Sequence, residues 1–165
     1  MVREKFTFFW NGPFSQWHQS EFTVGGQRFS CAEQFMMYCK ARLFRDLEAA
    51  ATILRSPTPE QQKALGRQVR GFEQETWELF REGIVATGSY AKFTQDAELR
   101  ELLLATSGTT LAEASPHDRI WGIGLGREDP RAKDRSRWRG RNLLGEILTR
   151  TREAIAWEMA RKGNA

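Results

Sequence analysis

The sequence predicts an α+β fold: one helix-rich domain over residues 1–165 with a small mixed β-sheet. Short strand-like segments cluster near the start of the chain and again late in it, and segments with helical periodicity fill the region between. This order does not alternate strand and helix as a doubly wound fold does. A chain of 165 residues, 40% of them hydrophobic, is long enough to bury one core. Only residues 160–165 are expected to fray.

The strands are predicted from short runs of aromatic and β-branched residues. They are expected at residues 6–10, 21–24, 27–29, 109–114 and 120–123. Gly25 and Gly26 separate the second strand from the third and suit a two-residue hairpin turn. Ser115 and Pro116 begin a turn between the last two, which are therefore expected to form a second hairpin.

Helix start and stop signals divide the rest of the chain. Helices are expected at residues 30–44, 46–56, 59–66 or 59–71, 73–87, 96–105 and 142–161. Ser30 is the expected cap of the first helix, with Glu33 three residues later completing a capping box. Thr58 and Pro59 begin the third helix. Gly88 is expected to end the fourth.

Composition narrows the class of protein. The start of the chain lacks the apolar core of a signal peptide, and no run reaches the roughly 20 apolar residues of a membrane helix, so a cytoplasmic protein without membrane contact is expected. Cys31 and Cys39 would lie about 12 Å apart along a helix, too far for a disulfide. Residues 127–141 hold seven basic and three acidic residues, which equals the whole net charge of +4. This segment is either a phosphate-facing loop or a solvated surface.

One face of the first predicted helix carries polar groups among apolar ones. Glu33, Met37, Lys40 and Phe44 follow at steps of four, three and four. A half-buried carboxylate and amine in such surroundings would have shifted pKa values and are candidates for a functional site. The structural alternatives are the capping box for Glu33 and a lysine stem lying over apolar surface for Lys40.

The richest polar segment is residues 110–124. It holds two carboxylates, Glu113 and Asp118, on either side of the Ser-Pro turn. Asp118 could equally form the turn by binding nearby backbone amides. Trp10 and Trp121 lie beside glycine turns, where an aromatic side chain could stack on a flat base. The chain lacks the motifs of P-loop NTPases, zinc proteases and G-x-S-x-G hydrolases, and its late glycines lack the spacing of a dinucleotide loop.

Taken together and in order, these segments resemble the NADAR domain family, which includes N-glycosidases. The matching residues are 12–17, 32–37 with Lys40, Ala41 and Phe44, 65–67 with Val69, Lys92, Phe93 and Gln95, 113–116 with Asp118 and 120–124, and 138–140 with 142–145. The resemblance implies a catalytic role for Glu33, Lys40 and Asp118. It implies substrate contacts at Trp10, Ser15, Trp77, Glu113, Ser115, Trp121, Gly122 and Asn142.

The resemblance also implies an activity. We expect hydrolysis of the C–N bond between a heterocycle and ribose 5-phosphate, with early riboflavin biosynthesis intermediates as substrates and no metal or other cofactor. The substrate would be a phosphorylated ribosyl heterocycle. Two alternatives stay open: hydrolysis of guanine-linked ADP-ribose, the only reading that involves nucleic acid, and a non-catalytic ADP-ribose-binding module. The enzymatic reading further expects Glu33 and Asp118 to meet across a shared hollow.

Overall fold

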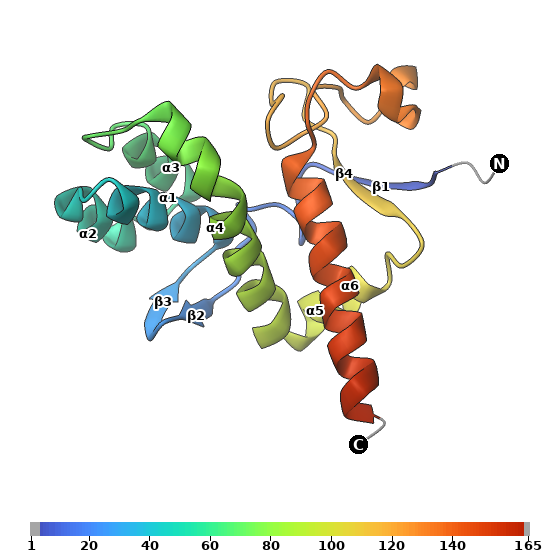
Figure 1. Ribbon diagram of the computed structural model, residues 1–165, viewed down its shortest axis with the longest axis horizontal. Helices are drawn as coiled ribbons and strands as arrows, with labels where there is room; N and C mark the ends of the chain where they lie inside the picture. Colours follow the sequence, from blue (N-terminus) through green and yellow to red (C-terminus); the bar gives the residue numbers. More distant parts are fainter. Residues whose placement is uncertain (1–3, 164–165) are drawn as a thin grey trace. The chain divides into compact units, whose positions relative to one another are not determined.

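The structure, a computed structural model, describes residues 4–163 and falls into two compact units (Figure 1). The central unit is Gln16–Asp96. The terminal unit combines Met1–Ser15 with Ala97–Ala165. Each unit has its own core, and the single domain expected over residues 1–165 stays a prediction.

Helix α1 lies at the centre of the central unit and packs against its three other helices (Figure 1). The elements of this unit are β2 (Phe22–Val24), β3 (Gln27–Phe29), α1 (Ala32–Leu43), α2 (Leu47–Arg55), α3 (Pro59–Gly66) and α4 (Gln74–Gln95). The predicted hairpin is confirmed, since β2 and β3 pair antiparallel with Phe22 opposite Phe29. These two rings pack with Phe35 of α1 and Ala91 of α4 in one hydrophobic core.

The predicted starts of α2 and α3 are confirmed. Both depend on a capping hydrogen bond between residues three positions apart. The side chain of Asp46 accepts a hydrogen bond from the Ala49 amide at 3.2 Å and starts α2. The hydroxyl of Thr58 accepts one from the Gln61 amide at 3.3 Å, and Pro59 occupies the first turn of α3. In both places the preferred cap residue satisfies an amide that the helix itself leaves unpaired.

The predicted capping box at the start of α1 is wrong. The N-cap is Cys31, whose side chain makes no capping bond. Gln34, not Glu33, reaches back: its Oε1 accepts from the Ser30 amide at 2.8 Å. Because Gln34 takes that role, capping no longer accounts for the carboxylate of Glu33.

The predicted end of the fourth helix at Gly88 is also wrong, because α4 continues to Gln95. Gly88 serves close packing instead of termination. A Cβ atom there would lie 2.5 Å from Cδ1 of Phe35. The ring of Phe35 meets that of Phe29 edge-on at 5.0 Å, so it is held from both sides.

The terminal unit is built on a parallel pair of strands, β1 (Phe6–Phe9) and β4 (Thr110–Glu113). Helix α6 (Leu143–Gly163) packs on β4, and α5 (Ala97–Leu104) packs on α6 (Figure 1). The α+β class is confirmed, although the described strands form two separate pairs where one mixed sheet was expected. Residues 160–163, expected to fray, are helical, and residues 164–165 lie outside the described part.

The strand predicted at residues 120–123 does not form, so the predicted late hairpin is wrong. Oδ1 of Asp118 accepts hydrogen bonds from the amides of Ile120 and Trp121, each at 2.8 Å, which folds the chain into a turn. Beyond that turn, one bond from the Ile123 amide to the Glu113 carbonyl, at 2.9 Å, joins the segment to β4.

Some of the arginines in the basic segment 127–141 form ion pairs that stabilise the fold. It forms two short 3₁₀ helices, Pro130–Lys133 and Arg135–Arg137. Arg131 pairs with Asp129 at 2.6 Å, and Arg135 pairs with both Glu4 and Glu146. Within residues 4–163, the helices are all too short or too polar to span a bilayer.

Candidate functional site

Glu33 and Lys40 project from the same face of α1 in the central unit. Glu33 lies in the first turn and is only 4% exposed, and Lys40 lies two turns later and is half-buried. The backbone amide of Glu33 donates to the carbonyl of Gln16 at 3.0 Å, which fixes the start of the helix. Met37 lies between them on this face and is also buried. The face predicted from periodicity is therefore present, with both polar groups set among apolar atoms.

Aromatic rings surround the Lys40 amine. Its Nζ lies 4.4 Å from the centre of the Phe72 ring and 5.6 Å from that of the buried Trp77. Phe44 meets Phe72 edge-on at 5.3 Å and extends this apolar surface. Trp77, predicted as a substrate contact, thus belongs to the same group of side chains as Lys40.

The surroundings of the Lys40 amine shift its pKa downwards. Burial lowers the pKa of Lys40, the nearby Arg67 charge lowers it further, and the Glu33 charge opposes the shift. A lysine with a lowered pKa holds more of its amine in the nucleophilic form at neutral pH, which suits attack on a carbonyl or anomeric carbon. The carboxylate of Glu33 can stabilise positive charge developing nearby.

The other predicted residues cluster in the loop after β4 of the terminal unit. Asp118 is half-buried and forms the turn described above, as its structural interpretation predicted. This turn sets the half-buried Trp121 beside Gly122. A Cβ at Gly122 would lie 2.9 Å from the carbonyl of Glu113, so the glycine lets the loop lie directly on the end of β4. Ser115 is buried at the same place.

Asn142 organises that strand end. It is 0% exposed and has a positive φ of 54°. Its Oδ1 accepts from the Glu113 amide at 3.0 Å, and its Nδ2 donates to the Leu111 carbonyl at 2.9 Å. Because both ends of the amide bind β4, the Asn142 side chain positions Glu113. The predicted contact of Asn142 with the substrate stays a prediction.

Two further predicted contacts differ in exposure. Trp10 is 62% exposed, and Ser15 is buried with its amide bound to the Gly12 carbonyl at 3.0 Å. The predicted site residues therefore form one group in the central unit and one in the terminal unit. The expected meeting of Glu33 with Asp118 stays a prediction.

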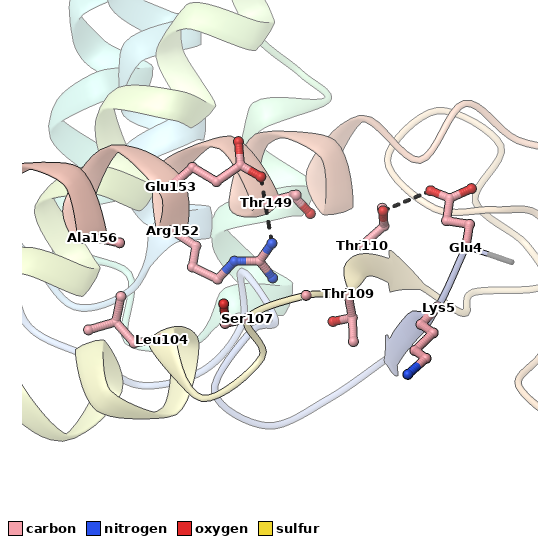
Figure 2. Close-up of a pocket in the computed structure, with 11 residues that line it drawn as sticks. Glu4, Lys5, Leu104, Ser107, Thr109, Thr110, Thr149, Arg152, Glu153 and Ala156 are labelled. Atoms are coloured by element: carbon pink, nitrogen blue, oxygen red, sulfur yellow. Dashed lines mark hydrogen bonds and ion pairs between the residues drawn. The ribbon is translucent and has the colours of Figure 1, made fainter. Parts of the chain in front are cut away.

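A cavity of about 490 Å³ in the terminal unit contains none of these residues (Figure 2). It lies between α6 and the segment that joins α5 to β4, and the first described residues also line it. Its polar groups serve the fold: the Thr110 hydroxyl donates to Glu4 at 2.8 Å, and Nη1 of Arg152 donates to the Thr106 carbonyl at 2.8 Å.

The sequence analysis missed three residues as site candidates. Phe72 and Arg67 lie in or beside the irregular segment between α3 and α4, where no periodicity marks a face. Lys92 lies on α4 four residues after Gly88 and is 2% exposed. Burial lowers its pKa to about 7, against the opposing charges of Cys31 and Asp96. Its helical step of four from the buried Gly88 could have marked Lys92 as buried, but the fourth helix was predicted to end at Gly88.

No trio of His, Cys, Asp or Glu side chains within residues 4–163 is arranged to hold a metal ion. The groups that α1 and its neighbours bring together in the central unit are a carboxylate, a shielded amine and aromatic rings.

A buried glutamate and a shielded lysine on one helix face of an α+β protein are the groups expected of an enzyme that uses a carboxylate and an amine in its reaction. Residues 8–156 match the NADAR domain, so the chain belongs to the NADAR family. It is 39% identical over 145 residues to N-glycosidase R617 of Acanthamoeba polyphaga mimivirus, a match that covers 85% of each chain. It is 31% identical over 147 residues to N-glycosidase YbiA of Escherichia coli strain K12, covering 89% of this chain and 83% of that protein.

Two further comparisons support the family and the fold. Protein irg-1 of Caenorhabditis elegans is 38% identical over 139 residues, and this match covers 83% of the present chain but 66% of the nematode protein. The NMR structure of E. coli YbiA superposes with a TM-score of 0.78 at 28% identity and covers 97% of this chain and 90% of that one.

Proposed function

We propose that this protein is an N-glycosidase that hydrolyses the C–N bond between a heterocycle and ribose 5-phosphate, with early riboflavin biosynthesis intermediates as its substrates. Relatives named N-glycosidases, from a virus and from E. coli, support a hydrolase acting on N-glycosyl bonds. The observation that carries the proposal is the shared face of Glu33 and Lys40, with the lysine amine shielded by Phe72 and Trp77.

Glu33 is proposed to assist the cleavage step. Cleavage of a C–N bond at an anomeric carbon builds positive charge on the sugar, as in the oxocarbenium-like states of glycoside hydrolysis. A carboxylate that is 4% exposed stabilises such charge more strongly than one in bulk water. The same carboxylate could instead take a proton from the attacking water.

Lys40 is proposed to form a Schiff base or to act through its charge. In the covalent route its neutral amine bonds to the sugar C1, the C–N bond to the heterocycle breaks, and the heterocycle leaves with a proton taken from the amine. The bond between C1 and the ring oxygen then breaks, the ring oxygen takes a proton, and the open-chain sugar is held as an imine on Lys40. Water then hydrolyses the imine, which releases ribose 5-phosphate and restores the amine. The lowered pKa of Lys40 supports this route because it increases the neutral fraction of the amine.

Asp118 is proposed to orient a ribose hydroxyl or to exchange a proton with the leaving nitrogen. A tryptophan is proposed to stack on the heterocycle, and Trp77 and Trp121 are the two candidates for this role. These roles rest on the family resemblance and on the half-buried setting of Asp118 and Trp121.

Turnover of a ribosylaminopyrimidine phosphate by the wild-type protein and by Glu33→Gln tests the proposal. The variant should release ribose 5-phosphate at least about 100-fold more slowly and still unfold cooperatively. Glu60→Gln makes the same change at an exposed glutamate of α3 and should keep full activity. Undiminished turnover by Glu33→Gln would remove Glu33 from the chemistry.

Borohydride added during turnover separates the two roles of Lys40. The covalent route predicts a reduced sugar adduct on Lys40, located by peptide mass spectrometry, and none on Lys92, which is 2% exposed. An unmodified Lys40 would leave it an electrostatic role. Parallel incubations with guanine-linked ADP-ribose establish which glycosyl group the site accepts.

A further inference from the structure

Arg67 and Lys40 form a pair of neighbouring cations in the central unit. The Arg67 charge acts on Lys40 strongly enough to be the second largest influence on its pKa, after burial. No salt bridge to a carboxylate within 4.0 Å is found for either side chain among residues 4–163. Two like charges held together in this way repel each other, and an anion bound beside them would relieve that repulsion.

The packing of α3 on α1 fixes this pair. A Cβ at Gly66 would lie 1.9 Å from Sδ of Met37, so only glycine lets the end of α3 lie directly on α1. Arg67 follows Gly66 as the C-cap of α3, and Lys40 follows Met37 by three residues on α1. One tight helix–helix contact therefore sets the backbone positions from which both cations extend.

Arg70, close to Arg67 in the chain, is an example of an arginine whose hydrogen bonds serve the fold. Arg70 binds the buried Asp46 through both Nε and Nη2, and its Nη2 also binds Glu48 at 3.0 Å. Arg67, three residues earlier and equally at the surface, lacks any such partner among the described residues. Its guanidinium is therefore available to a ligand, whereas that of Arg70 is committed to holding α2 in place.

Three other arginines are less suitable as phosphate ligands, because each already pairs with a carboxylate. Arg28 pairs with Glu21, Arg131 with Asp129, and Arg135 with two glutamates. Binding a phosphate at any of these would first require breaking an existing ion pair. Arg67 needs no such exchange.

We propose that Arg67 binds the phosphate group of the substrate beside Lys40 and thereby sets a preference for phosphorylated over unphosphorylated ribosides. The inference rests on the proposed function and names the residue that would select its substrate class. The planar guanidinium can donate two parallel hydrogen bonds to phosphate oxygens, and the dianion offsets the repulsion between the two cations.

The test compares kcat/KM for a ribosylaminopyrimidine phosphate with that for the same riboside lacking the phosphate. In Arg67→Gln the ratio of the two values should fall about 10- to 100-fold from that of the wild type. Changes that act through the Lys40 amine affect both substrates and cancel in this ratio. Arg55→Gln, at an exposed arginine that ends α2, should leave the ratio unchanged. An unchanged ratio in Arg67→Gln would overturn the assignment.

A binding measurement keeps this inference separate from the proposed activity. Calorimetric titration with ribose 5-phosphate should give at least about tenfold weaker binding to Arg67→Gln than to the wild type or Arg55→Gln. If the wild type cleaves neither riboside yet shows this difference, the proposed activity fails and the phosphate site stands. If ribose 5-phosphate binds all three proteins equally, or binds none of them, the phosphate site is overturned.

Discussion

The Nζ of Lys40 lies 4.4 Å from the centre of the Phe72 ring, and this ring is itself 40% exposed. Phe72 therefore forms a thin cover between the amine and water. Two effects of the ring oppose each other: its bulk excludes water and disfavours the ammonium form, while its π face attracts the ammonium. Since burial is the largest influence on Lys40, exclusion of water should dominate.

Phe72→Ala should accordingly raise the pKa of Lys40 towards its usual value. Reductive methylation with ¹³C-labelled formaldehyde would allow the Lys40 amine to be titrated by NMR. Phe80→Ala removes a comparably exposed ring from α4 and serves as the control, with no expected shift. A lower pKa in Phe72→Ala would show that attraction to the ring outweighs the exclusion of water.

Gly88→Ala should destabilise the protein by about 1–3 kcal/mol, because the new methyl group would enter the space of a buried ring. The Phe35 ring cannot easily move, since it packs edge-on against both Phe22 and Phe29. Urea unfolding followed by circular dichroism measures the change.

Gly83 offers a matched control on the same helix. A Cβ at Gly83 would meet no atom within 4 Å, so Gly83→Ala should gain about 0.5–1 kcal/mol from helix propensity alone. If both variants gained stability, the close packing of α4 on Phe35 would be refuted.

These glycines show which parts of the fold local sequence could predict. The hairpin at Gly25 and the starts of α2 and α3 were predicted correctly because the deciding contacts lie within a few residues. The end of α4 was misplaced because Gly88 is required by its close packing against Phe35, more than fifty residues away in the chain. A glycine signal alone does not distinguish a helix end from a close helix contact.

The candidate site divides in the same way. Periodicity placed Glu33 and Lys40 on one face because both lie on a single helix. The Ser-Pro segment was predicted as a hairpin because its apolar residues resemble a strand, whereas Asp118 turns the backbone at that point. Phe72 and Arg67 could not be predicted, since only the packing of α3 and the following segment brings them to Lys40.

Asn142→Ala should cost about 2–4 kcal/mol, because it removes two buried hydrogen bonds to β4 and leaves the Glu113 amide and the Leu111 carbonyl without them. Alanine is also strained at a φ of 54°. Asn142→Gly loses the same bonds without that strain and should be about 1 kcal/mol more stable than the alanine variant. Equal stability of the two variants in thermal unfolding would contradict the strained backbone.

The last prediction concerns the pH dependence of stability through Lys92. Its pKa is about 7 in the folded protein and about 10.4 in an unfolded chain. Between these values the unfolded chain binds a proton that the folded protein does not, so this lysine makes stability rise with pH. Below pH 7 both states are protonated, and its contribution to the slope vanishes.

Lys92→Met should therefore remove a slope that approaches about 1.4 kcal/mol per pH unit in the middle of that range. Urea unfolding of wild type and variant at pH 7, 8 and 9 measures it as a difference, in which most other titrating groups cancel. Cys31, Asp96 and His18 interact with Lys92 and are retained in both proteins. Lys133→Met, made at an exposed lysine, controls for the loss of one amine. Parallel pH profiles for wild type and Lys92→Met would mean that Lys92 keeps its proton in the folded protein, and its buried position would then have to hold a charged ammonium.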